Sequence, residues 1–157
     1  MPIILARIDD RLIHGQVTEG WGKVHEPQLI LVVSDGVAAT DWECDLCLAA
    51  LPSCIAGKVV NIDDAAHTIN ELHSDVRTAY VLFESPEDAY KVIKDGARIT
   101  KLNVGGMHST QGKREVLDYI YVDETDAYYL KALKDSGIEL DFRDLPEKED
   151  VDVMAIL

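Results

Sequence analysis

Basic residues are scarce in this chain, and their scarcity excludes several kinds of function. The 157 residues include 15 Lys and Arg against 29 Asp and Glu, so the formal net charge is −14. Nonspecific binding to nucleic acid and to anionic membrane surfaces both require a basic face. The composition therefore argues against both kinds of partner, and it leaves room for a small basic pocket.

Long apolar runs are also missing. No stretch of the sequence approaches the ~18 consecutive apolar residues that a transmembrane helix needs. The apolar run at the N-terminus is interrupted by Arg7, Asp9 and Asp10, and no small-residue cleavage site follows it, so it is not typical of a signal peptide. We therefore expect a cytoplasmic protein.

Cysteines are few, and nucleotide-binding motifs are absent. Cys44 and Cys47 have the spacing of half a zinc site or of a redox pair, but they lie in a helix-like segment and no second pair follows. We expect them, with Cys54, to be ordinary reduced cysteines. The sequence contains no G-x-x-x-x-G-K-[S/T] or G-x-G-x-x-G motif and no carboxylate cluster with metal-ligand spacing. We therefore expect neither a metal nor a cofactor.

The sequence does contain short apolar, β-branched runs that alternate with helix-length segments. The nearly continuous hydrophobicity of these runs suits strands that are buried on both faces, as in parallel sheets. The pattern predicts a single α/β domain over residues 1–157, with a doubly wound, mostly parallel sheet of about six to seven strands flanked by helices. The expected strands span residues 3–8, 28–33, 58–62, 78–83, 99–104, 119–122 and 139–142.

Helix start and stop signals lie between these strands. The clearest helix, in segment 85–96, has Ser85 as its N-cap, Pro86 at its first position and Gly96 as its stop. The acidic and then apolar segment 146–157 is expected to dock as an edge strand or a short helix, or to stay mobile until a partner covers it. Further helices are expected in segments 14–26, 40–51, 63–72 and 123–137.

Doubly wound sheets bind ligands outside the carboxyl ends of their strands, near a switch in strand order. This rule brings together loops that are far apart in the sequence and places them on one rim of the sheet. The rim loops are 9–15, 34–35, 84–85 and 105–114. The charged residues that follow the first strand therefore lie at the edge where we expect function.

His14 is the strongest candidate for a reactive side chain. Imidazole titrates near pH ~6.5, so a ring nitrogen is free at neutral pH to act as nucleophile, base or ligand. His14 lies at or just before a helix start, where unpaired N–H groups favour an anion, and Gly15 allows close approach to that backbone. Arg7 and Arg11 carry forked guanidinium groups that match phosphate oxygens.

Two further features support a phosphoryl site. Asp9 or Asp10 is placed to hold one ring N–H of His14, which would fix the tautomer and leave the other nitrogen free to react. Residues 96–114 contain four basic side chains and no acidic one, and their Gly105–Gly106 pair offers backbone amides to an anion. The arrangement predicts that a phosphoryl group moves from a donor to the histidine and then to an acceptor.

The segment "ARIDDRLIHGQV" (residues 6–17) resembles the active-site signature of the sorbose-subfamily IIB components of mannose-type (mannose, fructose and sorbose) bacterial phosphotransferase systems. Three more segments occur where that family has its strand-two loop, its S/T-P-E-D-A segment and its N-V-G-G-M loop. They are "LILVVSDGVA", "VLFESPEDAYKVIKDG" and "KLNVGGMHSTQGKR". The resemblance covers essentially the whole chain, and four matching segments in the same order make it specific.

The resemblance implies a phosphohistidine carrier of a sugar phosphotransferase system. Such a protein accepts phosphate from a IIA protein or domain on its own histidine, here His14 at Nδ1, and passes it to a sugar bound by the membrane IIC and IID components. The resemblance thus implies a protein-Nπ-phosphohistidine–sugar phosphotransferase. It is expected in the cytoplasm, associated with the inner membrane face through the permease. A homodimer is compatible with this role. The expected catalytic residues are His14, Arg11 and Asp10, and the expected phosphate-binding residues are Arg7, Gly15, Gln16, Ser85, Gly105 and Gly106.

Other interpretations of the same residues stay open at this point. A regulatory protein could use phosphorylated His14 as a signal and never pass the phosphate to a sugar. A small hydrolase or isomerase could use His14 and Asp10 as acid–base partners. Ser85 is also explained as a helix cap, His108 as a surface loop residue and Trp21 as part of the core.

Overall fold

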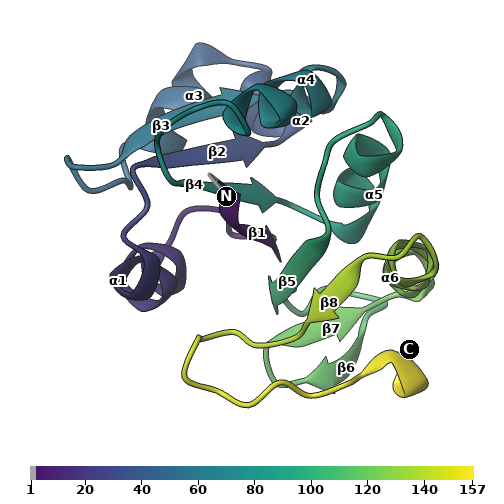
Figure 1. Cartoon of the computed structure of the whole chain (residues 1–157). Coiled ribbons are helices and arrows are strands. Elements are labelled where there is room, and N and C mark those ends of the chain that lie inside the picture. Colours follow the sequence, from purple (N-terminus) through teal and green to yellow (C-terminus); the bar gives the residue numbers. More distant parts are fainter. Residues whose placement is uncertain (1–2) are drawn as a thin grey trace.

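A six-stranded sheet forms the centre of the computed structural model, which describes residues 3–157 (Figure 1). The strands lie in the order β3-β2-β4-β1-β5-β8, and each neighbouring pair is parallel. They are β1 (Ile3–Asp9), β2 (Leu29–Val33), β3 (Ala56–Val60), β4 (Ala79–Phe83), β5 (Lys101–Gly106) and β8 (Glu139–Asp141). The predicted doubly wound, mostly parallel α/β architecture is confirmed.

The central strands are apolar throughout because the sheet is covered on both faces. Every residue of β2 and β4 is buried. Alternate side chains of β2 enter two separate cores: Leu29, Leu31 and Val33 belong to the first core, and Ile30 and Val32 belong to the second. A strand with a core on each side has no solvent-facing positions, which is why it lacks the polar alternation of a half-exposed strand.

Helices close both cores. The first core is covered by α4 (Ile62–Leu72), α5 (Pro86–Lys94) and α6 (Glu124–Asp135). The second core lies under η1 (Gln16–Trp21), a π-helix that continues into α1 (Gly22–His25), and next to α2 (Asp35–Ala38) and α3 (Asp41–Leu48). The helix expected after the first strand is therefore present, but its first part has the wider π-helical turn.

One expected strand lies outside the main sheet. The run 119–122 was expected there, but it instead contains β7 (Ile120–Val122), which pairs antiparallel with β6 (Arg114–Leu117) in a separate hairpin. The sequence prediction missed β6 because its residues are mostly polar and only partly buried, so they form no apolar run. Two backbone hydrogen bonds of Met107 attach the hairpin to the end of β5.

The helix ends follow the predicted signals. Ser85 caps α5, and its Oγ accepts a hydrogen bond from the N–H of Asp88 (3.1 Å). The chain leaves this helix at Gly96 with a φ of +108°, a left-handed conformation that favours glycine. Asp123 begins α6 with a reciprocal capping box.

The segment after β8 returns along the β6–β7 hairpin and ends near α6, as the yellow part of the chain in Figure 1 shows. It is held by Trp21, whose indole N–H donates to the carbonyl of Asp144 (2.8 Å), and by the burial of Val153. A short 3₁₀ helix, η2 (Met154–Ile156), ends it. Of the three conformations considered for residues 146–157, the structure shows a docked segment that ends in a short helix.

The first turn of α5 crowds several carboxylates together. Asp88 is partly buried there, and Glu84, Asp35 and Glu87 are close enough to act on it electrostatically. Burial, followed by these three negative neighbours, raises the pKa of Asp88 to about 6. The unfolded chain would release this proton at the ordinary aspartate pKa of about 3.9.

We expect Asp88→Asn to stabilise the protein at neutral pH. The raised pKa means that the folded state binds the proton more tightly than the unfolded state does, so this contribution to stability is complete below about pH 4 and is lost as the pH rises through about 6. The variant should raise the free energy of unfolding by on the order of 1 kcal/mol at pH 7.5, after allowance for solvent screening, and by nothing at pH 4.

Urea unfolding at the two pH values measures this difference. Asp63→Asn is the matched control, because Asp63 lies in the first turn of α4 but is exposed, and it should give no gain at either pH. An equal effect of Asp88→Asn at pH 4 and pH 7.5 would contradict the account.

Candidate active site

The loop after β1 lies on the predicted rim, because the carboxyl ends of β2, β4, β1 and β5 are adjacent in the sheet. It turns tightly: the N–H of Leu12 donates to the carbonyl of Asp9 (3.0 Å), and the N–H of Arg11 donates to Asp9 Oδ1 (3.0 Å). Leu12 has a φ of +59°, a left-handed conformation that costs about 1–2 kcal/mol. The burial of Leu12 and Ile13 in the second core holds this turn in place.

The turn brings His14 against the carboxylate at the end of its own strand. Nε2 of His14 lies 2.5 Å from Oδ2 of Asp9, and the histidine side chain keeps 15% of its surface exposed. A carboxylate only accepts hydrogen bonds, so Nε2 carries the hydrogen and Nδ1 of the neutral ring keeps its lone pair. The hydrogen bond therefore fixes the orientation of the ring through one of its two nitrogens.

Arg7 occupies the interior behind this pair and does not reach the rim. Its side chain is fully buried, and every guanidinium N–H has an acceptor. Nε and Nη2 donate to Asp9 Oδ2 (3.2 and 2.9 Å). Nη1 donates to Asn103 Oδ1 (2.7 Å) and to the carbonyl of Asp144 (3.1 Å). Nη2 also donates to Gln16 Oε1 (3.2 Å). This arrangement gives no support to the predicted direct contact of Arg7 with phosphate, because every guanidinium N–H already has an acceptor.

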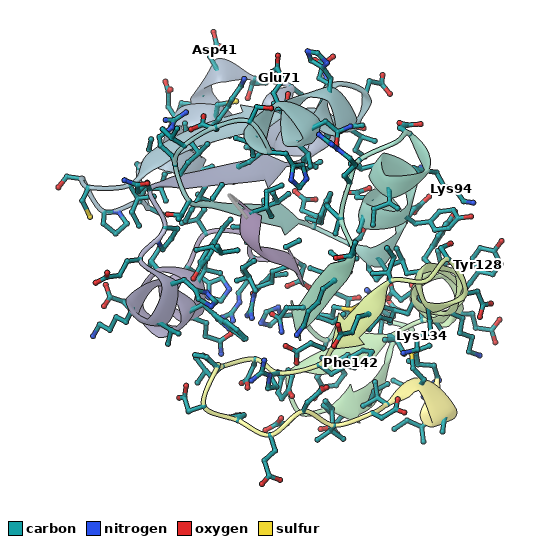
Figure 2. The ribbon with its side chains drawn as sticks, viewed as in Figure 1. Asp41, Glu71, Lys94, Tyr128, Lys134 and Phe142 are labelled. Atoms are coloured by element: carbon teal, nitrogen blue, oxygen red, sulfur yellow. The ribbon has the colours of Figure 1, made fainter. Side chains whose placement is uncertain are left out.

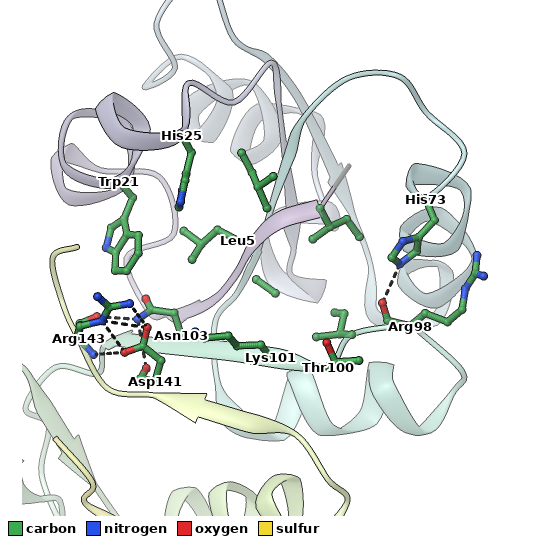
Figure 3. Close-up of a pocket in the computed structure, with 14 residues that line it drawn as sticks. Leu5, Trp21, His25, His73, Arg98, Thr100, Lys101, Asn103, Asp141 and Arg143 are labelled. Atoms are coloured by element: carbon green, nitrogen blue, oxygen red, sulfur yellow. Dashed lines mark hydrogen bonds and ion pairs between the residues drawn. The ribbon is translucent and has the colours of Figure 1, made fainter. Parts of the chain in front are cut away.

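Asn103 fixes the far side of this guanidinium. Its amide nitrogen donates to the carbonyls of Asp141 (3.2 Å) and Arg143 (2.8 Å), so its oxygen is directed at Arg7. On the amino-terminal side of this contact, β1 and β5 are no longer paired, and a cavity of about 300 Å³ opens between them (Figure 3). Arg143 forms part of the cavity wall, pairs with Asp141 and lies over the ring of Trp21.

The electrostatics of the buried pair keep Asp9 ionised. Burial alone would raise the pKa of Asp9, but the hydrogen bond from His14 and the charge of Arg7 more than offset it, so the pKa lies below its usual range. Burial lowers the pKa of Arg7, and Asp9 opposes this shift. His14 therefore faces a fixed negative charge at neutral pH.

Arg11 is the arginine that lies at the surface of the site. Its side chain is exposed, and its Nη2 donates to Oε1 of Gln16 (3.3 Å), the same oxygen that accepts from Arg7. Gln16 thus links the buried guanidinium to the exposed one. Gly15 is also exposed and has an ordinary helical φ of −55°, and a side chain there would meet no atom within 4 Å. It leaves open space beside His14.

Gly105 and Gly106 make room for the ion pair and do not form an exposed cradle. Both are buried within β5. A methyl group at Gly105 would overlap the guanidinium of Arg7, and one at Gly106 would lie 2.9 Å from the carboxylate of Asp9. This arrangement gives no support to the predicted phosphate contact of their amides. It shows another reason for glycine here, because two charged side chains pack against this strand.

Asp10 holds His108 and does not hold His14. Its Oδ2 accepts the backbone N–H of His108 (2.7 Å), and its Oδ1 is paired with Nδ1 of the same residue. Of the two aspartates considered for the ring of His14, the structure selects Asp9, because Asp10 lies beyond the strand end and faces the loop after β5. The expected catalytic contact of Asp10 is not present.

The remaining rim residues have structural partners. Ser85 caps α5 as described, and Ser34 donates its hydroxyl hydrogen to Glu84. The expected phosphate contact of Ser85 gains no support from this arrangement.

Within residues 3–157, no three or more His, Cys, Asp or Glu side chains are grouped so that they could hold a metal ion, and Cys44 and Cys47 are not bonded to each other.

Two residues that support the site were missed by sequence reasoning. Asn103 gave a usable signal, since it is a polar residue between Leu102 and Val104 in the buried part of β5, and such a residue needs a buried partner. Asp144 gave no signal, because it contributes its backbone carbonyl, which any residue could supply.

Comparison with known proteins identifies the family of this chain. The family model described as "PTS system sorbose subfamily IIB component" matches residues 3–157. The chain is 37% identical over 157 residues to the fructose-specific EIIB component of Bacillus subtilis (strain 168), covering all of this chain and 96% of that protein. It is equally identical to the mannose-specific EIIAB component of Escherichia coli (strain K12), of which it covers 49%.

Solved structures give the same result. The crystal structure of the IIBSor domain of the sorbose permease from Klebsiella pneumoniae matches with a TM-score of 0.89 at 33% identity, covering 99% of this chain and 95% of that one. The chain therefore belongs to the sorbose-subfamily IIB components of the phosphotransferase system. These components are phosphotransferases that pass phosphate to a sugar, and they act with IIA and with membrane IIC and IID partners. No helix in residues 3–157 has the length and apolar character needed to cross a bilayer.

We expect Gly105→Ala to destabilise the protein strongly. The added methyl group would displace the Arg7 guanidinium and leave the Asp9 carboxylate without its buried partner, and breaking such a pair costs about 3–5 kcal/mol. Gly15→Ala is the matched control, because its helical φ and open surroundings accept a side chain and should give a gain of about 0.4–1 kcal/mol. Urea unfolding measures both variants, and similar stabilities for the two would contradict this role of Gly105.

Proposed function

We propose that His14 carries the phosphoryl group of this IIB protein, on Nδ1. The hydrogen bond between Nε2 of His14 and Asp9 (2.5 Å) is the observation that supports this assignment. It occupies one ring nitrogen and leaves the other with a lone pair, which is the state that a nucleophilic imidazole requires. His14 lies on the carboxyl rim of the sheet and keeps part of its side chain exposed, which gives partners access to the ring.

The transfer takes place in two substitutions at phosphorus. In the first, the Nδ1 lone pair attacks the phosphohistidine of IIA, a new N–P bond forms, and the donor nitrogen keeps the electrons of the bond that breaks. In the second, a sugar hydroxyl oxygen attacks the same phosphorus, the N–P bond of His14 breaks, and its electrons return to Nδ1 while the hydroxyl proton is released. The enzyme's contribution is positioning and charge stabilisation.

Asp9 and Arg7 act through the ring rather than on the phosphoryl group. When the N–P bond forms, the imidazole ring gains positive charge, and the fixed carboxylate of Asp9 stabilises that charge. Arg7 holds Asp9 in position and keeps it ionised. We therefore assign both as positioning residues.

Arg11, Gln16 and Gly15 form the part of the site that contacts phosphate oxygens. Arg11 offers an exposed guanidinium that matches two oxygens at once. Gln16 orients this guanidinium through Oε1, and its own NH₂ group is a further donor. Gly15 follows His14 directly, is exposed and has no side chain that would hinder approach to its backbone N–H.

The partners set the place of the protein in the cell. The mannose-specific relative of E. coli is an EIIAB component, which indicates that IIA and IIB work in immediate succession. We propose that the phosphate comes from the histidine of a IIA protein or domain and goes to a sugar held by IIC and IID. This role places the protein in the cytoplasm, in contact with the inner membrane face through the permease.

The alternative of a hydrolase or isomerase requires His14 and Asp10 to work together as an acid–base pair. The carboxylate of Asp10 is engaged by His108 instead. The regulatory alternative uses the same phosphorylated histidine, and it differs from the carrier only in that no sugar phosphate forms.

His14→Gln should abolish phosphorylation by a phosphorylated IIA donor and leave the fold intact. Glutamine has no nucleophilic ring nitrogen, so the acid-labile, base-stable label should disappear. Mass spectrometry of the intact protein after incubation with the donor measures the loss of one PO₃ adduct. His67→Gln is the control, because His67 is exposed on α4, and it should be labelled normally. A labelled His14→Gln protein would show that another residue is the acceptor.

Arg11→Lys should lower the transfer rate, whereas Arg7→Lys should lower the stability of the fold, although the chemical change is the same. At Arg11, one point charge replaces a two-pronged contact, so the transfer rate should fall about tenfold (~1.4 kcal/mol). Its unfolding free energy should change by less than about 0.5 kcal/mol, because the side chain is exposed. At Arg7, the loss of several buried hydrogen bonds should lower the unfolding free energy by about 3 kcal/mol or more.

Rapid-quench labelling and urea unfolding measure the two effects separately. A normal transfer rate for Arg11→Lys would remove Arg11 from the mechanism. A normal stability for Arg7→Lys would show that the buried network is not needed for the fold.

A further inference from the structure

Helix α3 exposes apolar side chains beside the active site. None of its eight residues is buried. Trp42 and Leu46 are 71% and 60% exposed, and their spacing of four residues places them on one stripe of the helix. Tryptophan is enriched in the energetically dominant positions of protein interfaces, so an exposed Trp–Leu stripe indicates a partner.

This stripe faces the loop that carries His14. Trp42 and Leu46 line a groove of about 490 Å³, and Arg11, Leu12 and Ile13 of that loop line the same groove. Arg11 is thus part of the groove and also part of the proposed phosphate site. A partner seated in the groove would be in contact with the loop that presents Nδ1 of His14.

Acidic side chains line and surround the groove. Between Lys23 and Lys58 the sequence contains five acidic residues and no Lys or Arg. Asp41 points outward at the start of α3, as Figure 2 shows, and Glu43 and Glu84 line the groove itself. A complementary partner therefore combines apolar side chains with a basic surround.

We propose that this groove, the α3 groove, is where the membrane permease docks. Cytoplasmic segments of membrane proteins carry an excess of Lys and Arg, which matches the acidic residues around the groove. The lipid surface itself is not the occupant, since the anionic leaflet repels acidic residues. The permease must also bring its bound sugar to His14, and residues 11–13 of the loop that carries His14 line the groove. This inference rests on the proposed function.

Sugar phosphorylation by prephosphorylated protein on membrane vesicles that contain IIC and IID tests the proposal. The KM for this protein should rise at least tenfold in Trp42→Ala, while kcat stays within about twofold, because the variant removes a contact made equally before and during transfer. Tyr128→Ala is the matched control: Tyr128 is an aromatic residue of α6 with 65% exposure, outside the groove, and its KM should not change.

Glu43→Lys provides a second, electrostatic variant. It reverses a charge in the groove without removing the apolar stripe, and it should also raise KM, with a larger effect at low salt than at high salt. Both residues lie on a helix with no buried side chain, so both variants should fold normally.

The outcomes separate the docking proposal from the proposed function. An unchanged KM in both variants would overturn the docking proposal. A defect confined to labelling by IIA would also overturn it, because the groove would then bind the donor. Binding to anionic vesicles without permease that equals binding to vesicles with permease would overturn it as well, because the groove would then bind lipid. A wild-type protein that takes no phosphate on His14 would instead overturn the proposed function.

Discussion

The buried ion pair of Arg7 and Asp9 is the interaction on which the rest of the site depends. Two opposite charges without solvent contact are stable only when their remaining hydrogen-bonding groups are satisfied. Arg7 meets this condition with an acceptor for every N–H, and Asp9 meets it by accepting from Arg7, from the turn at Arg11 and from His14. The reactive histidine is therefore one of the partners that the buried carboxylate needs.

This requirement connects distant parts of the chain. The guanidinium of Arg7 takes its other acceptors from Asn103, 96 residues away, and from the backbone of Asp144, 137 residues away. The glycine pair in β5 is the consequence of packing both charged side chains against one strand. The C-terminal segment, which appears remote from the rim in the sequence, thus contributes to the orientation of His14.

The sequence allowed the sheet, the rim loops and the position of His14 on the rim to be predicted, because apolar runs and strand ends are local features. It did not allow the burial of Arg7 to be predicted. Strand alternation places Arg7 and Asp9 on the face opposite Ala6 and Ile8, but whether that face is buried there depends on residues far along the chain. The choice between Asp9 and Asp10 as the partner of His14 also depends on a distant residue, because Asp10 is held by His108. The hairpin strand β6 was missed because backbone pairing, and not an apolar run, defines it.

We propose above all that Asp9 fixes the proton on one nitrogen of His14 and thereby selects the other for chemistry. Nitrogen-15 and phosphorus-31 NMR of the isotopically labelled protein, before and after phosphorylation by IIA, tests it most directly. We predict a hydrogen on Nε2 in both states and a phosphorus–nitrogen coupling to Nδ1 in the phosphorylated state. A phosphorus coupling to Nε2 would contradict the claim, because that nitrogen would have to leave the buried carboxylate in order to react.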